Sequence, residues 1–292
     1  MEKKILVIGT GFLGRNLIEQ LKKRDNEIIG TSYQNLKQSD IFLDINDLGS
    51  IKKLLDGLKP KIIINCAANT NVDYLETHPD EAFSINAYAP RNLAVICNKN
   101  NIKLIQISTN SVFDGRNELY SEKDVPNPIN IYAKSKLLGE NLVIENLSNY
   151  IIIRTNFFGF NHEVKFLFNS ILNTLSENKE FIGFDDVVFN PLEITNLAQM
   201  IDEIANSEFR GIINLSSNDV ISKYQFAQEI AKVFHFDLGL VKKGLVDDIQ
   251  FDAIRPKNTS LSNEKSKSIL KTKIISIKDS LEKIKHEKFT ML

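Results

Sequence analysis

Short runs rich in isoleucine and valine alternate with longer segments of helical periodicity through the first half of the chain. The runs predict strands at residues 4–8, 27–31, 41–43, 61–65, 103–107 and 150–154. The segments between them predict helices at residues 12–23, 48–58, 79–100 and 131–146. Strands that are apolar on both faces and separated by helices favour a parallel sheet covered on both sides. The predicted fold class is therefore α/β, with a doubly wound parallel sheet of the Rossmann type.

The pattern loosens after residue 154. Helices are predicted at residues 165–176, 194–206, 223–236 and 274–284, with strands at 181–184 and 211–215. Because no low-complexity linker separates the halves, we expect the second region to pack on the first as a smaller, mixed α/β domain. The predicted division is a first domain at 1–155, completed by part of 192–222, and a second, interleaved domain at 156–292.

Composition excludes several classes of protein. The chain has 36 Lys and Arg against 37 Asp and Glu, so its net charge of -1 gives no overall basic field for nucleic acid or anionic lipid. Two cysteines, Cys66 and Cys97, are too few for a disulfide scaffold, and the four histidines lack metal-ligand spacing. No apolar run approaches the ~18 residues of a membrane span. We expect a cytoplasmic protein without a metal, a nucleic-acid partner or a membrane partner.

Three glycines follow the first predicted strand at the start of the first predicted helix. Gly9, Gly11 and Gly14 form the sequence GTGFLG. In this arrangement the first glycine makes a tight turn, the second lets a diphosphate approach the backbone, and the third lets helix and strand pack closely. The N–H groups and positive end of the helix attract the diphosphate. The first domain is therefore predicted to bind a dinucleotide.

The end of the second predicted strand bears on which dinucleotide is bound. An enzyme selective for NAD usually places an Asp or Glu there to bind the ribose 2'-hydroxyl. Here residues 30–34 read GTSYQ, and no acid occurs until Asp40. Ser32, with Lys37 and Arg15 nearby, would tolerate a 2'-phosphate better than a carboxylate would. We expect NADPH as the cofactor, with NADH as the alternative.

Two tyrosines are followed by a lysine four residues later. Tyr33 and Lys37 lie outside any predicted helix, whereas Tyr132 and Lys136 open the helix IYAKSKLLGEN and project from one face of it. A phenol has an ordinary pKa of about 10, so it transfers a proton near pH 7 only where its anion is stabilised. A neighbouring ammonium supplies that stabilisation. Tyr132 and Lys136 are therefore the predicted catalytic pair.

Thr109 follows the predicted strand at 103–107. Ligands meet an open parallel sheet at this carboxyl edge. The threonine hydroxyl can donate a second hydrogen bond to the substrate oxygen that Tyr132 would protonate. Thr109 is therefore the third predicted catalytic residue.

At these residues the chain resembles the dTDP-4-dehydrorhamnose reductase family of the extended short-chain dehydrogenases/reductases. The resemblance covers nearly the whole length and rests on GTGFLG, NCAANTNVDYLETHPDEAFSINAYAPRNLA, ISTNSVFDG, YAKSK, RTNFFG, INLSSNDVISKYQFAQEIA and RPKNTSLS. It implies that Thr109, Tyr132 and Lys136 form a catalytic triad, and that Lys136 also holds the nicotinamide ribose. It further implies that Ala67 and Ala68 line the cofactor groove.

The resemblance also implies that Asn86 lies near the active-site helix, which completes the expected cofactor site. The residues predicted to bind the cofactor are Gly9, Gly11, Phe12, Leu13, Gly14, Ser32, Lys37, Asp44, Ala67, Ala68, Asn86 and Lys136.

The substrate implied by the resemblance is a nucleotide-linked sugar, whose diphosphate would meet Arg255. Two segments depart from the family pattern. Residues 108–111 read STNS where many members read STDY, and Phe157 or Phe158 stands where a tryptophan often packs on the sugar. A core role is an equal alternative for either phenylalanine. The predicted substrate residues are Asn110, Ser111, Asn156, Phe157 and Arg255, and the departures leave the sugar and the nucleotide open.

The reaction implied is NADPH-dependent reduction of the C4 keto group of a nucleotide-linked 4-keto-6-deoxy sugar, for surface polysaccharide precursor synthesis. Dehydration is disfavoured because Asn110 and Ser111 are not carboxylates. An epimerase that retains its nicotinamide remains an alternative. So does a regulatory subunit similar to the beta subunit of methionine adenosyltransferase, although such a role places no demand on Thr109, Tyr132 and Lys136. The family often forms dimers, so a homodimer is a further expectation.

Overall fold

The computed structural model describes residues 3–24, 26–33, 41–161 and 166–289. Within them, seven strands form one sheet in the order β11-β6-β5-β4-β1-β2-β3, and every neighbouring pair is parallel. The strands are β1 (Lys3–Ile8), β2 (Asn26–Ser32), β3 (Ile41–Phe42), β4 (Ile62–Asn65), β5 (Lys103–Ile107), β6 (Tyr150–Thr155) and β11 (Gly211–Leu215). The predicted α/β class and doubly wound parallel sheet are confirmed.

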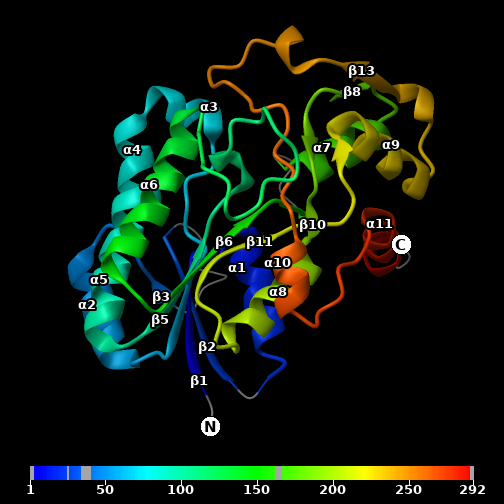
Figure 1. The fold of residues 1–292 in the computed structure, drawn as a ribbon. Helices are drawn as coiled ribbons and strands as arrows, with labels where there is room; N and C mark the ends of the chain where they lie inside the picture. Colours follow the sequence, from blue (N-terminus) through cyan, green and yellow to red (C-terminus); the bar gives the residue numbers. More distant parts are fainter. Residues whose placement is uncertain (1–2, 25, 34–40, 162–165, 290–292) are drawn as a thin grey trace.

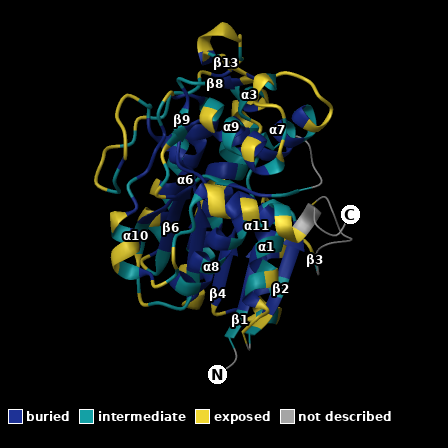
Figure 2. Ribbon diagram, turned by 90° about the vertical axis from the view of Figure 1, so that its right-hand side faces the viewer, coloured by how far each residue is buried: buried dark blue, intermediate teal, exposed yellow. Residues whose placement is uncertain are grey.

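Helices cover both faces of the sheet. Figure 1 shows α2 (Leu48–Leu58), α5 (Ala89–Asn100) and α6 (Ile131–Asn146) on one side and α1 (Phe12–Leu21) and α8 (Ile194–Ala205) on the other. Alternate residues of β1 enter separate cores, since Ile5 and Val7 pack with α1 and α8, whereas Leu6 and Ile8 pack with α2 and α5. The sheet is accordingly buried on both faces (Figure 2), as a strand without polar alternation requires.

A second layer of structure surrounds an aromatic core. It contains α7 (Leu167–Ser176), α9 (Lys223–Phe234) and α11 (Ile277–Phe289), with β8 (Phe181–Phe184) paired in parallel to β13 (Val241–Gly244). Phe158, Phe168 and Phe226 pack together in this core, with ring centroids of Phe158 and Phe226 5.1 Å apart. Two further pairs join β7 (Phe157–Phe158) to β10 (Leu192–Glu193) and β9 (Val188–Phe189) to β12 (Ile221–Ser222). The boundaries of the two domains, 1–155 with part of 192–222 and then 156–292, remain a prediction.

The prediction of one regular α-helix at 79–100 is wrong, although all of these residues are helical. It is built from α4 (Pro79–Phe83), the π-helix η2 (Ser84–Tyr88) and α5. Within the junction, the Ala89 N–H donates to the Ser84 carbonyl oxygen five residues earlier. Pro90 has no N–H to donate, so the α-helical ladder is interrupted where the π-turn occurs.

Several short elements carried no clear periodicity and were not predicted. They are the strands β7, β9, β10, β12 and β13, with α3 (Val72–Thr77), α10 (Glu264–Ile269), η3 (Asn110–Val112), η4 (Leu238–Leu240) and η5 (Val246–Asp248). In the described ranges, no helix combines the length and apolarity needed to cross a membrane. Nor do three or more His, Cys, Asp or Glu gather there into a group able to hold a metal ion.

Residues 255–262 run between the two layers and are fixed by hydrogen bonds on both sides. The Tyr120 N–H donates to the Ser260 carbonyl oxygen at 2.9 Å, and the Ser262 N–H donates back to the Tyr120 carbonyl oxygen at 2.9 Å. The Asn190 amide bonds the Leu261 backbone at both its N–H and its carbonyl oxygen. Most of this segment is therefore structural.

Candidate active site

The glycine turn after β1 is folded against the end of β4. Gly9 has a φ of +87°, and a Cβ on it would lie 2.6 Å from the Ala67 nitrogen. A Cβ on Gly14 would lie 2.1 Å from the Gly9 carbonyl oxygen, so α1 approaches the turn this closely only with glycine. The N–H groups of Gly9 and Thr10 both donate to the Thr31 carbonyl oxygen at 3.0 Å. The turn is thus fixed between the ends of β2 and β4.

Gly11 is glycine for a different reason. Its φ of -68° and ψ of -159° suit any residue, and among the described residues no atom lies within 4 Å of a Cβ built on it. It is the N-cap of α1 and offers no side chain to the first N–H groups of that helix, which begins at Phe12. Leu13 is buried in the sheet core. Open space in front of helical N–H groups fits a diphosphate.

The ends of β2 and β3 bring two further predicted cofactor residues together. Ser32 is half-buried, and its carbonyl oxygen accepts a hydrogen bond from the Leu43 N–H at 3.0 Å. Asp44 follows, with its Oδ1 accepting from the Asn46 N–H at 2.9 Å. Lys37 lies outside the described residues. Ser32 and Asp44 therefore flank the same sheet edge as the glycine turn.

Asn86 holds the loop after β4. Its side chain is buried, and Nδ2 donates to the Asn69 carbonyl oxygen at 3.0 Å and to the Ser135 Oγ at 3.1 Å. Its Oδ1 accepts from the Asn69 N–H at 3.1 Å. These bonds tie α6 to the loop that contains Ala67 and Ala68, both of them partly exposed. The arrangement gives Asn86 a positioning role in the predicted cofactor groove.

Tyr132 and Thr109 meet at the carboxyl end of β5. The Asn130 side chain caps α6 by accepting a hydrogen bond from the Ala133 N–H at 2.9 Å, so the helix begins just before Tyr132. Burial raises the pKa of the Tyr132 phenol, and its hydrogen bond with the Thr109 side chain acts in the opposite direction. The predicted proton donor and the predicted threonine hydroxyl therefore lie beside each other at this strand end.

Lys136 lies one helical turn beyond Tyr132. Its Nζ donates to the Ile107 carbonyl oxygen at 2.8 Å, two residues before Thr109. Burial lowers the pKa of Lys136 to about 8, while the negative charge of Glu140 acts to raise it. The other neighbour is the Cys66 thiol, whose pKa burial raises to about 12 against the opposing charge of Lys136. Lys136 therefore lies between the loop after β5 that contains Thr109, here called the catalytic loop, and the predicted cofactor groove at Ala67.

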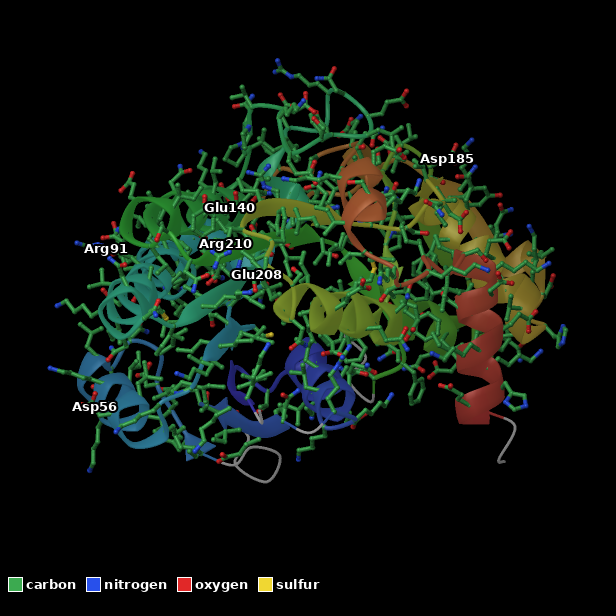
Figure 3. The ribbon with its side chains drawn as sticks, turned by 60° about the horizontal axis from the view of Figure 1, so that its bottom comes forward. Asp56, Arg91, Glu140, Asp185, Glu208 and Arg210 are labelled. Atoms are coloured by element: carbon green, nitrogen blue, oxygen red, sulfur yellow. The ribbon has the colours of Figure 1, made fainter. Side chains whose placement is uncertain are left out.

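A buried ion pair supports this part of α6. The Arg154 Nη2 lies 2.7 Å from the Glu140 Oε2, with side-chain exposures of 3% and 1%. The Ser108 hydroxyl also donates to Glu140, which is labelled in Figure 3. The Arg154 guanidinium stacks over the Phe113 ring, 5.2 Å from its centroid. The pair joins α6, the loop after β5 and the end of β6, so it fixes Lys136 relative to Thr109.

Two predicted substrate residues have structural hydrogen bonds. Asn110 is buried, and its Nδ2 donates to the Thr259 carbonyl oxygen at 3.1 Å and to the Thr259 Oγ1 at 2.8 Å. The Ser111 N–H donates to the Thr109 Oγ1 at 3.1 Å. Asn110 thus ties the catalytic loop to the segment 255–262, and the substrate contacts of Asn110 and Ser111 remain predictions.

A cavity of about 270 Å³ opens beside the start of α1. Phe12, a predicted cofactor residue, lines it together with the predicted substrate residues Asn156 and Phe157. The ring centroid of Phe12 lies 6.2 Å from that of Phe157. Phe158 also lines the cavity and packs into the aromatic core as well. Both phenylalanines therefore border the cavity, and Phe158 has a core role in addition.

Arg255 is anchored by a residue that sequence reasoning missed. Asp73, on α3, accepts from the Arg255 Nη2 at 2.5 Å and from the Ala253 N–H at 3.1 Å. Lys223, at the start of α9, was missed as well, although its side chain lines the cavity. Both lie in segments that carry the family resemblance, but neither spacing nor periodicity distinguishes them from surface charges.

Comparison with known proteins decides the family. A model of the RmlD substrate binding domain matches residues 3–289. The crystal structure of a dTDP-4-dehydrorhamnose reductase ortholog from Clostridium acetobutylicum is 31% identical, with a TM-score of 0.89 over 97% of this chain and 99% of that chain. The chain belongs to the dTDP-4-dehydrorhamnose reductase family. The resemblance seen in the sequence, and with it the class of short-chain oxidoreductase, is confirmed.

The chain is also similar to two named reductases and to a subunit of methionine adenosyltransferase. The dTDP-4-dehydrorhamnose reductase of Bacillus anthracis, solved in complex with NADP, is 28% identical with a TM-score of 0.89, covering 99% of both chains. A probable low-salt glycan biosynthesis reductase of Haloferax volcanii is 29% identical over 86% of both chains. The methionine adenosyltransferase 2 subunit beta of Bos taurus is 28% identical over 89% of this chain and 80% of its own.

Proposed function

We propose that the chain reduces the C4 keto group of a nucleotide-linked 4-keto-6-deoxy sugar with NADPH, and that the product serves the synthesis of surface polysaccharide precursors. The observation that carries the proposal is that Tyr132 and Thr109 lie beside each other at the end of β5, while Lys136, one helical turn beyond Tyr132, donates to the Ile107 carbonyl oxygen of the same strand. Three groups that a carbonyl reduction needs are thereby gathered at one strand end. The reductase names of the relatives from Bacillus anthracis and Haloferax volcanii support the same reaction class.

The residues around the glycine turn fit a dinucleotide. Gly11 would admit the diphosphate, Ala67 and Ala68 would line the groove, and Ser32 with Asp44 would meet the adenosine ribose. The absence of an acid in residues 30–34 favours NADPH over NADH. A nicotinamide dinucleotide bound there supplies a hydride.

Tyr132 is suited to donate the proton. Because burial raises the pKa of its phenol, the group stays protonated at neutral pH until a substrate oxygen begins to gain negative charge. The Thr109 hydroxyl can then share that oxygen by donating a hydrogen bond. The Lys136 ammonium stabilises the phenolate that remains after transfer.

Lys136 must carry its proton for this purpose. A pKa lowered to about 8 leaves most of the ammonium charged at pH 7. Its hydrogen bond to the Ile107 carbonyl oxygen and the charge of Glu140 both favour the charged form. The same ammonium is placed to hold the nicotinamide ribose.

A regulatory subunit is the second candidate function. The similarity to methionine adenosyltransferase 2 subunit beta favours it. The intact Thr109, Tyr132 and Lys136 set favours an enzyme, since a binding role does not require these side chains. An epimerase of the same fold would use the same pair but would consume no free NADPH.

A screen of dTDP-, UDP-, GDP- and CDP-linked 4-keto-6-deoxy sugars tests the proposal, followed as loss of nicotinamide absorbance. We expect stoichiometric oxidation of NADPH with at least one sugar, and oxidation slower by roughly 10²-fold or more with Tyr132→Phe. Conversion of sugar without NADPH loss would indicate an epimerase. No conversion of any sugar, together with a stable protein partner on purification, would indicate a regulatory subunit.

A further inference from the structure

Glu76 binds the first residue of the helix that carries Tyr132. Its Oε2 accepts a hydrogen bond from the Ile131 N–H at 2.9 Å. Because Ile131 begins α6, its N–H has no partner within that helix. Glu76 comes from α3, 55 residues earlier in the sequence, and α3 lies beside the start of α6 (Figure 1). The helix is therefore held by a side chain of another element, one residue before the predicted proton donor.

The apolar side chains of α3 share a small core with Tyr132. Val72, Leu75 and Glu76 are three and four residues apart, so they lie on one face of α3. Leu75 is fully buried and forms one cluster with Tyr132 and Ala133, against which Val72 packs. The same face of α3 therefore packs around the Tyr132 side chain and binds the backbone just before it.

The position of α3 is itself fixed by a second segment. A helix of six residues is too short to be stable alone, so its place depends on its contacts. The Asp73 Oδ1 accepts from the Ala253 N–H at 3.1 Å, and the Asp73 Oδ2 lies 2.5 Å from the Arg255 Nη2. α3 is thus anchored to residues 253–255 and can act as a fixed support for the start of α6.

We propose that Glu76 is a positioning residue for Tyr132, because its carboxylate fixes the first turn of α6 and with it the phenol. The inference rests on the proposed function, in which that phenol donates the proton. Proton transfer requires the phenol oxygen to lie within hydrogen-bond distance of the substrate oxygen, and a misplacement of about 1 Å can cost about 10²-fold in rate. Asn130 binds the same turn at the Ala133 N–H. Loss of Glu76 should therefore displace the turn without unfolding the helix.

Glu76→Met tests the proposal beside Glu76→Gln. Both variants keep the length of the side chain, but only glutamine keeps an oxygen that can accept from the Ile131 N–H. Glu76→Met should lower kcat roughly 10-fold to 100-fold, with KM and the dissociation constant of NADPH much less affected. Glu76→Gln should keep kcat within about 3-fold of the wild type. Glu76→Ala, which also removes the acceptor, gives the same test should Glu76→Met fail to fold.

Asp219 offers a matched control. Its Oδ2 accepts from the Ile277 N–H at 2.6 Å, and Ile277 is the first residue of α11. This bond is of the same kind as the one that Glu76 makes, but α11 contains none of the residues predicted for the site. Asp219→Ala and Glu76→Met should both lower the melting temperature by roughly 1–4 °C, as expected for loss of one helix cap. Only Glu76→Met should lower kcat.

A measurement without turnover separates this inference from the proposed reaction. Carbon-13 at the tyrosine Cζ reports the surroundings of each phenol by NMR, and the Tyr132 resonance is the one that is missing when Tyr132→Phe is added to the same protein. In Glu76→Met this resonance should shift or broaden, because the first turn of α6 is no longer fixed. In Glu76→Gln and Asp219→Ala it should match the wild type.

Unchanged kcat in Glu76→Met would overturn the proposal, as would an equal fall of kcat in Glu76→Gln or in Asp219→Ala. If the wild type reduces no sugar, the proposed function fails and the resonance alone decides the role of Glu76. A Tyr132 resonance that is the same in Glu76→Met and the wild type would then overturn the positioning role. Failure of the positioning role is therefore distinguishable from failure of the reductase reaction.

Discussion

Alanine at Gly11 separates cofactor binding from folding. The backbone there already has a conformation that alanine adopts, and a Cβ would enter open space. Loss of a glycine stabilises the folded state by about 0.4–1 kcal/mol through the unfolded chain. The poorer N-cap residue costs a similar amount, of about 0.5–1 kcal/mol. The free energy of unfolding should therefore change by less than about 1 kcal/mol.

The affinity for NADPH should respond quite differently. A methyl group in front of the first N–H groups of α1 would keep a diphosphate from the hydrogen bonds offered there. Loss of one charge-assisted hydrogen bond costs about 1.5–3 kcal/mol, which corresponds to about 10-fold to 100-fold in the dissociation constant. Fluorescence titration with NADPH measures this loss, and urea unfolding measures stability.

Two further alanine variants serve as controls for Gly11→Ala. Gly57, inside α2, also has open space around a Cβ, so Gly57→Ala should bind NADPH normally and gain about 0.5–1 kcal/mol of stability. Gly14→Ala forces a Cβ to 2.1 Å from the Gly9 carbonyl oxygen and should destabilise the fold. Wild-type NADPH affinity in Gly11→Ala would refute the placement of the diphosphate on this turn.

Four other outcomes are expected. Tyr132→Phe should lower turnover by roughly 10²-fold or more, with the dissociation constant of NADPH nearly unchanged, in a steady-state assay beside a direct titration. Arg255→Ala should raise KM more than it lowers kcat, and the reverse pattern would contradict a role in ground-state binding. The kcat should fall as the pH rises through about 8, where the Lys136 ammonium loses its proton. Glu140→Gln removes a negative charge that raises the pKa of Lys136, so the fall in kcat should occur at lower pH in this variant. A fall at the same pH as in the wild type would contradict the assignment of this pKa to Lys136. Gly139→Ala places a Cβ 2.2 Å from the Asn86 carbonyl oxygen, so the free energy of unfolding measured in urea should fall by about 1–3 kcal/mol or more. An unchanged free energy of unfolding would mean that α6 and η2 can move apart to admit the methyl group.

The sheet and the glycine turn could be predicted because their causes are local in the sequence. Runs that are apolar on both faces specify strands buried on both sides, and a strand, a GTGFLG turn and a helix occur in direct succession. The same holds for Tyr132 and Lys136, since four residues on a helix bring two side chains onto one face. Each of these predictions depends only on residues within a few positions of one another along the chain.

The roles of the buried amides could not be predicted, because each depends on a partner far away in the sequence. Asn86 bonds Ser135, 49 residues later, and Asn110 bonds Thr259, 149 residues later. Nothing in the local pattern distinguishes these residues from amides that face a ligand. Two-residue strands such as β7 and β10 could not be predicted for the same reason. They are defined by their pairing with each other, and two residues are too few to show an alternating pattern.

The substrate side was predicted least completely. Arg255 was singled out by resemblance, but its partner Asp73 comes from α3, 182 residues earlier. Lys223 gives no sequence signal, because its unusual feature is three-dimensional: among the residues that the structure describes, no carboxylate is paired with its ammonium. Charges of this kind become visible only when the surroundings of each side chain are known.

Transfer of deuterium from NADPH that carries deuterium in place of both hydrogens at nicotinamide C4 tests the central claim most directly. The product formed from a nucleotide-linked 4-keto-6-deoxy sugar would be analysed by mass spectrometry, with Tyr132→Phe as the control. The arrangement of Tyr132, Lys136 and Thr109 predicts one deuterium at C4 of the sugar for each NADPH consumed, and a rate of transfer lower by roughly 10²-fold or more in the variant. A sugar product without deuterium, or equal transfer by wild type and Tyr132→Phe, would contradict it.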